Sequence, residues 1–198
     1  MIAIVDYGAG NLNSVKKAFD HLGAATVVTR QPAAVAAADR IVLPGVGHFS
    51  ALSILDNGGL RDALLQDASA GKPFLGICLG MQWLFEGSEE APECAGAGIL
   101  AGRCHRFPSS VKSPHVGWNS LTVRGGSRLL RNVAPDSFVY YTHSYQAPVV
   151  AATTAQTEYG ARFSAAVEQG NVFGVQFHPE KSSKVGLQIL KNFCDADL

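Results

Sequence analysis

The most reactive side chain that this sequence offers is a cysteine framed by glycines. Cys78 lies in the stretch GICLG, at residues 76–80, after an apolar run and before a segment of helical character. This pattern is the thiol counterpart of the G-x-S-x-G nucleophile elbow, in which glycines allow a tight turn from strand to helix. A helix N-terminus favours the thiolate, and the Leu79 N–H at that terminus is placed to donate to an oxyanion. A thiol that only fills the core is the alternative.

A candidate base for this thiol lies about a hundred residues further along the chain. The apolar run NVFGVQF, at 171–177, is followed by His178, Pro179 and Glu180. Because Pro179 stops the strand and extended residues i and i+2 project to the same side, Glu180 is expected to orient the His178 ring. A histidine at a strand end that merely bonds nearby backbone is the alternative. Together with Cys78, the pattern favours a Cys-His-Glu triad for nucleophilic catalysis.

A glycine-rich loop is suited to stabilise the charge that such an attack creates. The segment VLPGVGHF, at 42–49, follows an expected strand, and glycines flank Val46. Backbone N–H groups in such a loop suit an oxyanion or a phosphate, so the peptide between Val46 and Gly47 is a candidate donor. A tight strand-to-helix turn without chemistry is the alternative.

Two further patterns point only weakly to a cofactor or a metal. The turn YGAGN, at 7–11, contains G-x-G, but Asn13 stands where a dinucleotide-binding turn has its third glycine, and no acidic residue ends the second strand. The residues that resemble zinc ligands lack the spacing of a zinc site: Cys94, Cys104, His105 and His115. The sequence therefore predicts neither a cofactor nor a metal.

The elements that must position these residues alternate between strand and helix in the first half of the chain. Strand patterns occur at 2–6, 25–29, 40–45 and 73–78, and helix patterns occur at 11–23, 32–40, 50–58, 60–71 and 79–87. Such alternation predicts an α/β fold, with a mostly parallel central sheet covered by helices on both faces. Sites in these sheets gather at the carboxyl ends of the strands, which brings the glycine-rich loops and Cys78 together.

From about residue 98 the strand patterns follow one another without clear helices. They lie at 116–123, 137–145, 149–154, 163–170 and 172–177, and we expect them as antiparallel additions to the sheet. Apolar residues at helical spacing within 182–198 predict a last helix that packs back on the sheet. The length and composition predict that residues 1–198 form a single domain.

Charge and hydropathy exclude several classes of function. Lysines plus arginines and aspartates plus glutamates each number 16, and no basic run offers a footprint for nucleic acid or an anionic membrane. The beginning of the chain is unlike a signal peptide, and no apolar run approaches the ~18 residues of a membrane span. Four irregularly spaced cysteines fit a reducing compartment. We therefore expect a cytoplasmic protein that binds a small ligand, without contact to nucleic acid or membrane.

Three of these motifs together resemble class I glutamine amidotransferases. They are PGVGHF at 44–49, GICLGMQ at 76–82 and HPEKS at 178–182, and the resemblance runs over essentially the full length. Four further segments are similar to the family of glutaminase subunits of imidazole glycerol phosphate synthase, in histidine biosynthesis: DYGAGNLNSV, HVGWN, YTHSY and GVQFHPEKSSKVGLQILKNF. The resemblance implies a flavodoxin-like fold.

The same resemblance implies a reaction. Cys78 would attack the side-chain amide of glutamine while His178 handles the protons and Glu180 orients His178. Ammonia would leave, and a glutamyl thioester would be hydrolysed to glutamate. The implied oxyanion hole consists of Leu79 and the Val46–Gly47 peptide. The implied substrate contacts are Gln82, Thr142, His143, Ser144 and Tyr145.

The resemblance also implies a protein partner, a (β/α)8 barrel synthase bound as a heterodimer. That partner receives the ammonia through its interior and uses it on the phosphoribulosyl nucleotide PRFAR, which yields imidazole glycerol phosphate and the aminoimidazole carboxamide nucleotide AICAR. The positions that match this interface are Asn11, Asn13, Trp118, Asn119 and Lys181. His48 departs from the family, which usually has a small residue there.

Two other functions remain open. The glutaminase of pyridoxal 5'-phosphate synthase is similar in length and triad, but it carries a Gly-Gly-Glu-Ser type of loop in place of PGVGHF. A catalytically silent, amidotransferase-like subunit is the second alternative, and it would be expected to lack Cys78, His178 or Glu180, which are all present.

Overall fold

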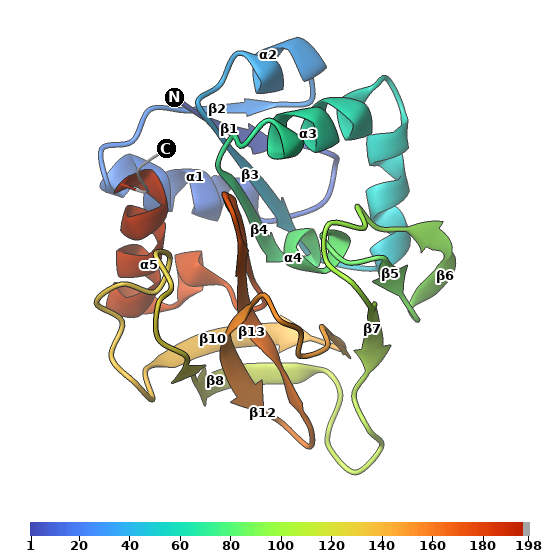
Figure 1. The fold of residues 1–198 in the computed structure, drawn as a ribbon, viewed down its shortest axis with the longest axis vertical. Coiled ribbons are helices and arrows are strands. Elements are labelled where there is room, and N and C mark those ends of the chain that lie inside the picture. Colours follow the sequence, from blue (N-terminus) through green and yellow to red (C-terminus); the bar gives the residue numbers. More distant parts are fainter. Residues whose placement is uncertain (196–198) are drawn as a thin grey trace.

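The centre of the protein is an eight-stranded sheet. Figure 1 shows the fold, which is a computed structural model that describes residues 1–195. The strand order is β2-β1-β3-β4-β14-β13-β12-β9. Strands β2, β1, β3, β4 and β14 run parallel to one another, and β13, β12 and β9 continue the sheet in antiparallel fashion. The strands span Ile2–Val5 (β1), Thr26–Thr29 (β2), Arg40–Gly45 (β3), Phe74–Cys78 (β4), Thr122–Val123 (β9), Thr153–Glu158 (β12), Arg162–Gln169 (β13) and Val172–Val175 (β14). The expected α/β fold with a mostly parallel sheet is confirmed.

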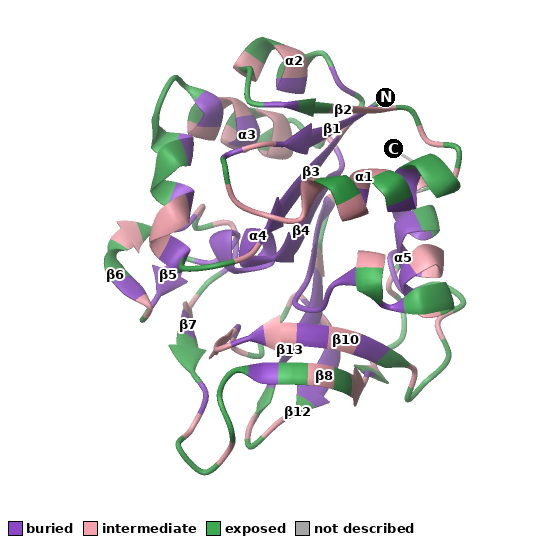
Figure 2. Ribbon diagram, turned by 180° about the vertical axis from the view of Figure 1, so that it is seen from behind, coloured by how far each residue is buried: buried purple, intermediate pink, exposed green. Residues whose placement is uncertain are grey.

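Helices cover both faces of this sheet because its central strands are apolar on both sides. Along β1, Ile2 and Ile4 pack with α1 and α5, whereas Ala3 and Val5 pack with α2 and α3 on the opposite face. The helices are α1 (Leu12–His21), α2 (Pro32–Ala36), α3 (Leu60–Ser69), α4 (Leu79–Trp83) and α5 (Ser183–Asp195). Figure 2 shows the central strands as buried and the outer sides of α1 and α5 as exposed. Within residues 1–195, no helix combines the length and the apolarity needed to span a membrane.

One expectation about the sheet is wrong: strand β14 is parallel to its neighbour β4, not antiparallel. Its register places Gly174 opposite Gly76. The tight turn between β13 and β14, at Gly170, reverses the chain, so β14 runs in the same direction as the strands of the first half. The carboxyl ends of β4 and β14 therefore meet at one edge of the sheet.

We expected the other strands of the second half to join the central sheet, but several of them lie in two small separate sheets. Strand β8 (His115–Ser120) pairs with β10 (Phe138–His143). A four-stranded sheet has the order β11-β7-β5-β6 and spans Gly87–Ser88 (β5), Ala91–Ala95 (β6), Arg103–Arg106 (β7) and Tyr145–Gln146 (β11). On the two-stranded sheet, Val139 and Tyr141 enter the core while Trp118 and Phe138 face outward. The core thus lies on only one face of this pair of strands.

Two helices are also shorter or tighter than the sequence predicts. Residues 50–58 were expected as an α-helix, but Phe49–Asp56 form the 3₁₀-helix η1. The helix expected at 79–87 ends at Trp83, where the chain turns into β5. Helix α4 is therefore short, and its main structural role is to form the turn at Cys78 that precedes it.

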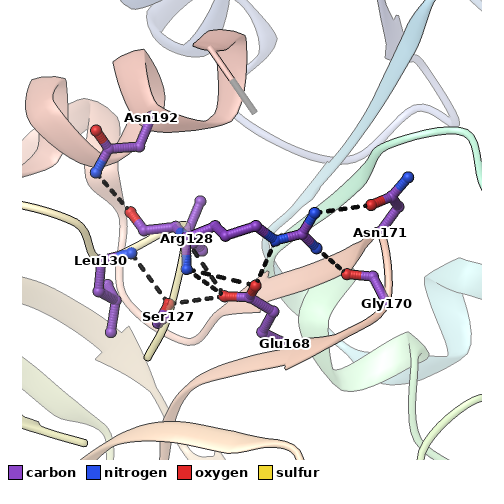
Figure 3. Close-up of polar contacts among 8 residues, drawn as sticks. Ser127, Arg128, Leu130, Glu168, Gly170, Asn171 and Asn192 are labelled. Carbon is purple, nitrogen blue, oxygen red and sulfur yellow. Dashed lines mark hydrogen bonds and ion pairs between the residues drawn. The ribbon is translucent and has the colours of Figure 1, made fainter. Parts of the chain in front are cut away.

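A polar network ties the irregular segment 124–137 to the sheet and to α5 (Figure 3). The Glu168 carboxylate accepts hydrogen bonds from the Arg128 backbone N–H, at 3.0 Å, and from the Arg128 Nε, at 2.9 Å. The Arg128 guanidinium also donates to Asn171 Oδ1 at 3.0 Å, and Asn192 of α5 donates to two carbonyls of the segment. The network holds a long loop against the end of β13.

Candidate active site

Cys78 lies on a strained turn between β4 and α4. Its φ of 53° and ψ of −104° are values that a side-chain-bearing residue rarely adopts, and they are typical of a nucleophile elbow. The turn needs its glycines, because a Cβ atom on Gly80 would overlap the Leu43 carbonyl and one on Gly76 would lie 2.5 Å from the Gly80 carbonyl. The glycine frame therefore exists to let the backbone pass closely behind the thiol.

His178 and Glu180 follow β14 and reach the same edge of the sheet. His178 Nδ1 lies 2.9 Å from Glu180 Oε1, and both side chains are almost fully buried. Glu180 sits in a 3₁₀ turn, η2 (Pro179–Lys181), rather than in extended chain as expected. Burial lowers the pKa of His178, but the nearby Cys78 sulfur and the Glu180 carboxylate outweigh it and raise that pKa well above its usual value. The ring is thus held in its charged form.

A cavity of about 270 Å³ opens beside the thiol. Its volume and its largely polar lining suit a ligand of the size of an amino acid. It is lined by Gly47, Cys78, Leu79, Gln82, Glu90, Pro114, Thr142, His143, Ser144 and Tyr145. The structure therefore brings all the expected substrate contacts to one cavity with the expected nucleophile.

Of the two loop residues expected at the oxyanion hole, Val46 and Gly47, only Gly47 lines this cavity. Strand β3 pairs Gly45 with Cys78, and the loop that follows places Gly47, at φ 103°, on the cavity wall. Val46 is not among the lining residues, so its contribution is limited to the peptide that it shares with Gly47. His48 is exposed and its Nδ1 accepts a hydrogen bond from the Ser50 N–H, which caps η1. The unusual histidine thus ends the loop without entering the cavity.

Two histidines form a hydrogen-bonded pair behind the cavity. His143 Nδ1 lies 2.8 Å from the Tyr145 carbonyl and so carries the proton, which leaves His143 Nε2 to accept from His115 Nδ1 at 3.2 Å. Burial lowers the pKa of His143 to about 3 and that of His115 to about 4. Both rings are therefore neutral at pH 7, and they fix the backbone of the segment that lines the cavity.

The residues expected at a partner interface fall into two groups. Trp118 is 51% exposed, and its ring lies 6.0 Å from that of Tyr140, over which Lys181 Nζ is placed at 5.8 Å. Asn13 is exposed at the start of α1, next to the half-buried Asn11, and α1 contacts η2, which contains Lys181. These four expected residues lie on connected surface elements.

Asn119 differs from this expectation because its side chain turns inward. Its Nδ2 donates to the Glu158 carbonyl at 3.1 Å and lies 3.4 Å from His115 Nε2. Neighbouring residues of a strand face opposite sides, so the exposure of Trp118 directs Asn119 toward the core. The half-buried Asn119 amide thus supports the histidine pair, and its place at a partner interface stays a prediction.

Comparisons with known proteins agree with this geometry. Residues 3–196 match the family described as "Glutamine amidotransferase class-I". The chain is 48% identical over 197 residues to the imidazole glycerol phosphate synthase subunit HisH of Methanothermobacter thermautotrophicus, covering 98% of both chains. The HisH subunit of Moorella thermoacetica is 46% identical over 198 residues, covering 97% of this chain and 93% of that protein. The chain belongs to the HisH family of class I glutamine amidotransferases.

Solved structures with much lower identity share the fold of this HisH-family chain. A crystal structure of a glutamine amidotransferase superposes with a TM-score of 0.78 at 18% identity and covers 98% of both chains. The structure of PurLQS from Thermotoga maritima gives a TM-score of 0.74 at 20% identity, with 98% of this chain and 97% of that chain covered. The fold therefore persists where the sequences differ widely.

Two residues of this HisH-family site were missed by sequence reasoning. Glu90 is the one carboxylate among the lining residues of the cavity, and its Oε2 accepts from the Phe49 N–H at 2.8 Å. Gln176 is fully buried, and its Nε2 lies 3.6 Å from the Cys78 sulfur. In the sequence, Glu90 follows another glutamate in a polar stretch and looks like solvated surface. The signal for Gln176 was a polar residue inside an apolar strand, two positions before the histidine.

Proposed function

We propose that this HisH-family chain is the glutaminase subunit of imidazole glycerol phosphate synthase and hydrolyses glutamine to glutamate and ammonia. The observation that carries the proposal is the convergence of the buried His178–Glu180 pair on Cys78, which lines a cavity of about 270 Å³. We also propose that residues 1–198 act as one glutamine amidotransferase domain. The four cysteines are free thiols, which suits a reducing cytoplasm.

The proposed reaction runs through a covalent intermediate on Cys78. The thiolate attacks the side-chain amide carbon of glutamine, and the developing oxyanion is held by the N–H groups of Leu79 and Gly47. His178 then protonates the amide nitrogen, and ammonia leaves with rupture of the C–N bond. A water molecule that gives its proton to His178 attacks the thioester, the C–S bond breaks, and glutamate is released. The charge of Glu180 stabilises the imidazolium in both steps.

Substrate recognition is proposed to use three sides of the cavity. Glu90 presents a negative charge to the α-ammonium group of glutamine. The peptide groups of 142–145 face the α-carboxylate and the side chain of the substrate glutamine. The histidine pair fixes this segment through the bond from His143 to the Tyr145 carbonyl. Both N–H groups of the Gln82 amide are used within the protein, so its oxygen is the atom left for the ligand.

The partner is proposed to dock on the outer face of the two-stranded sheet. Val116, Trp118 and Phe138 are 57%, 51% and 58% exposed and lie on this face, which is an unusual concentration of apolar surface. Thr142, on the same face of β10, lines the cavity. A (β/α)8 barrel synthase seated there would receive ammonia directly from the cavity and convert PRFAR to imidazole glycerol phosphate and AICAR.

The test measures glutamate release by the chain alone and with the barrel partner and PRFAR present. We expect slow hydrolysis by the isolated chain, strong stimulation in the complex, and complete loss in Cys78→Ala. Trp118→Ala should weaken stimulation and leave the activity of the isolated chain intact. Release of ammonia by Cys78→Ala at the parental rate would contradict the mechanism, and an equal response of Trp118→Ala and the parent to the partner would contradict the docking face.

A further inference from the structure

We propose that Gln176 is a further catalytic residue, whose side-chain amide donates a hydrogen bond to the Cys78 sulfur and favours its thiolate. The inference rests on the proposed glutaminase function and deepens it. Gln176 directly follows β14, two residues before His178, and has no exposed surface. An amide buried at this position must bond within the protein, since an unsatisfied one is costly.

Three contacts fix which end of the Gln176 amide faces the sulfur. Gln176 Nε2 lies 3.6 Å from Cys78 Sγ, and Gln176 Oε1 lies 3.1 Å from Gln82 Nε2. Gln82 Nε2 in turn lies 2.9 Å from the Tyr145 carbonyl, which can only accept. Gln82 must therefore present its nitrogen to Gln176, Gln176 must accept with its oxygen, and its N–H groups are left for the sulfur. The orientation is anchored on a backbone group.

A donor at this place acts on the ionisation of the thiol. A hydrogen bond to an ionised acceptor is stronger than one to a neutral acceptor, so the Gln176 N–H stabilises the thiolate more than the thiol. The Thr142 carbonyl, 3.9 Å from the sulfur, accepts from the S–H and favours the thiol form. Gln176 offsets that preference without introducing a charge into the buried site.

The same contact serves both halves of the proposed reaction. The sulfur is a thiolate when it attacks the amide carbon, and it becomes one again when water attacks the thioester and the C–S electron pair returns to sulfur. The proton of that water passes to His178, so Gln176 gives up no proton in either step. A fixed N–H donor lowers the energy of the sulfur anion as nucleophile and as leaving group.

The test is the pH dependence of Cys78 alkylation by iodoacetamide, which needs no glutamine. The background is Cys94→Ser with Cys194→Ser, because those two thiols are partly exposed, and Cys78→Ala in that background gives the blank. Gln176→Leu removes the donor at similar volume. In Gln176→Leu we expect the midpoint of the alkylation profile to rise by about one pH unit. At pH values below the midpoint, Cys78 should be alkylated about tenfold more slowly than in the parent. Gln188→Leu, on α5, is the matched control and should leave the profile unchanged.

A double-mutant cycle tests the orientation by Gln82. Gln82→Met should raise the midpoint although Gln82 does not touch the sulfur, and it should add nothing in the Gln176→Leu background. Gln176→Glu keeps the shape and an acceptor for Gln82, so it should raise the midpoint further. An unchanged midpoint in folded Gln176→Leu or Gln176→Glu, as judged by circular dichroism, would overturn the proposal. Retained glutaminase in Cys78→Ala would instead overturn the proposed function, so the two failures are distinguishable.

Discussion

His178 Nδ1 lies 2.9 Å from Glu180 Oε1, and the two side chains are 2% and 1% exposed. The carboxylate accepts from Nδ1 of the charged ring and orients it so that the buried Nε2 points away from Glu180 and is left for the Cys78 sulfur. A buried ring nitrogen oriented in this way is available for proton transfer beside Cys78.

Glu180→Gln should lower the pKa of His178, because the Cys78 sulfur and the Glu180 carboxylate together raise that pKa, and the neutral amide keeps a hydrogen bond but removes the Glu180 charge. We expect glutaminase kcat in the complex to fall by about 10- to 100-fold, with a smaller change in KM. The pH profile of kcat/KM should change shape in the variant. An unchanged kcat and profile would show that the carboxylate does not act on the ring.

Glu90→Gln should mainly weaken binding of glutamine. The amide can still accept from the Phe49 N–H, so the loop stays in place, but the charge facing the α-ammonium group is lost. A rise in KM of roughly 10- to 100-fold with a nearly constant kcat is expected from the loss of one charged hydrogen bond. Glu93→Gln, on exposed β6 nearby, is the control and should behave as the parent. A parental KM in Glu90→Gln would remove Glu90 from the substrate site.

The neutral histidine pair should make the fold less stable as the pH falls from 7 to 5. Burial lowers the folded-state pKa of His115 to about 4 and that of His143 to about 3, whereas both are about 6.5 in the unfolded chain. Between these values the unfolded state binds more protons, so stability is lost below pH 6.5, by roughly 1 to 2 kcal/mol per histidine. Urea unfolding at both pH values measures the loss. His115→Gln should lower the pH dependence, and an equal slope in parent and variant would contradict this account.

Glu168→Ala should destabilise the protein by about 2 kcal/mol or more. Its carboxylate is 11% exposed and accepts from both the backbone and the side chain of Arg128, so its removal leaves partly buried donors unpaired. Glu158→Ala is the contrast, because the Glu158–Arg162 pair is 70% and 74% exposed and should contribute less than about 1 kcal/mol. Thermal and urea unfolding of the two variants and the parent measure the two losses of stability. Similar losses in both would mean that the network in Figure 3 does not stabilise the loop.

Sequence reasoning found strands β1 to β4, helices α1, α2 and α3, and the turn around Cys78, because each depends on local signals. Apolar periodicity marks the elements, and a glycine frame marks a turn in which a Cβ would collide with backbone. It failed for β14, since the direction of a strand depends on which neighbour it pairs with. It also gave no sign that the Asn119 amide bonds to the Glu158 carbonyl, because that direction depends on the exposure of the strand face that carries Trp118.

The sequence by itself thus determined the type of fold, the family resemblance and the identity of the thiol, base and carboxylate. Only the tertiary structure decided which polar residues join them. Gln176 contacts the thiol because β14 lies parallel to β4, and Glu90 reaches the cavity because the β5–β6 turn folds back against η1. Both results are long-range pairings, and residue type and spacing carry no information about which distant segment supplies the partner.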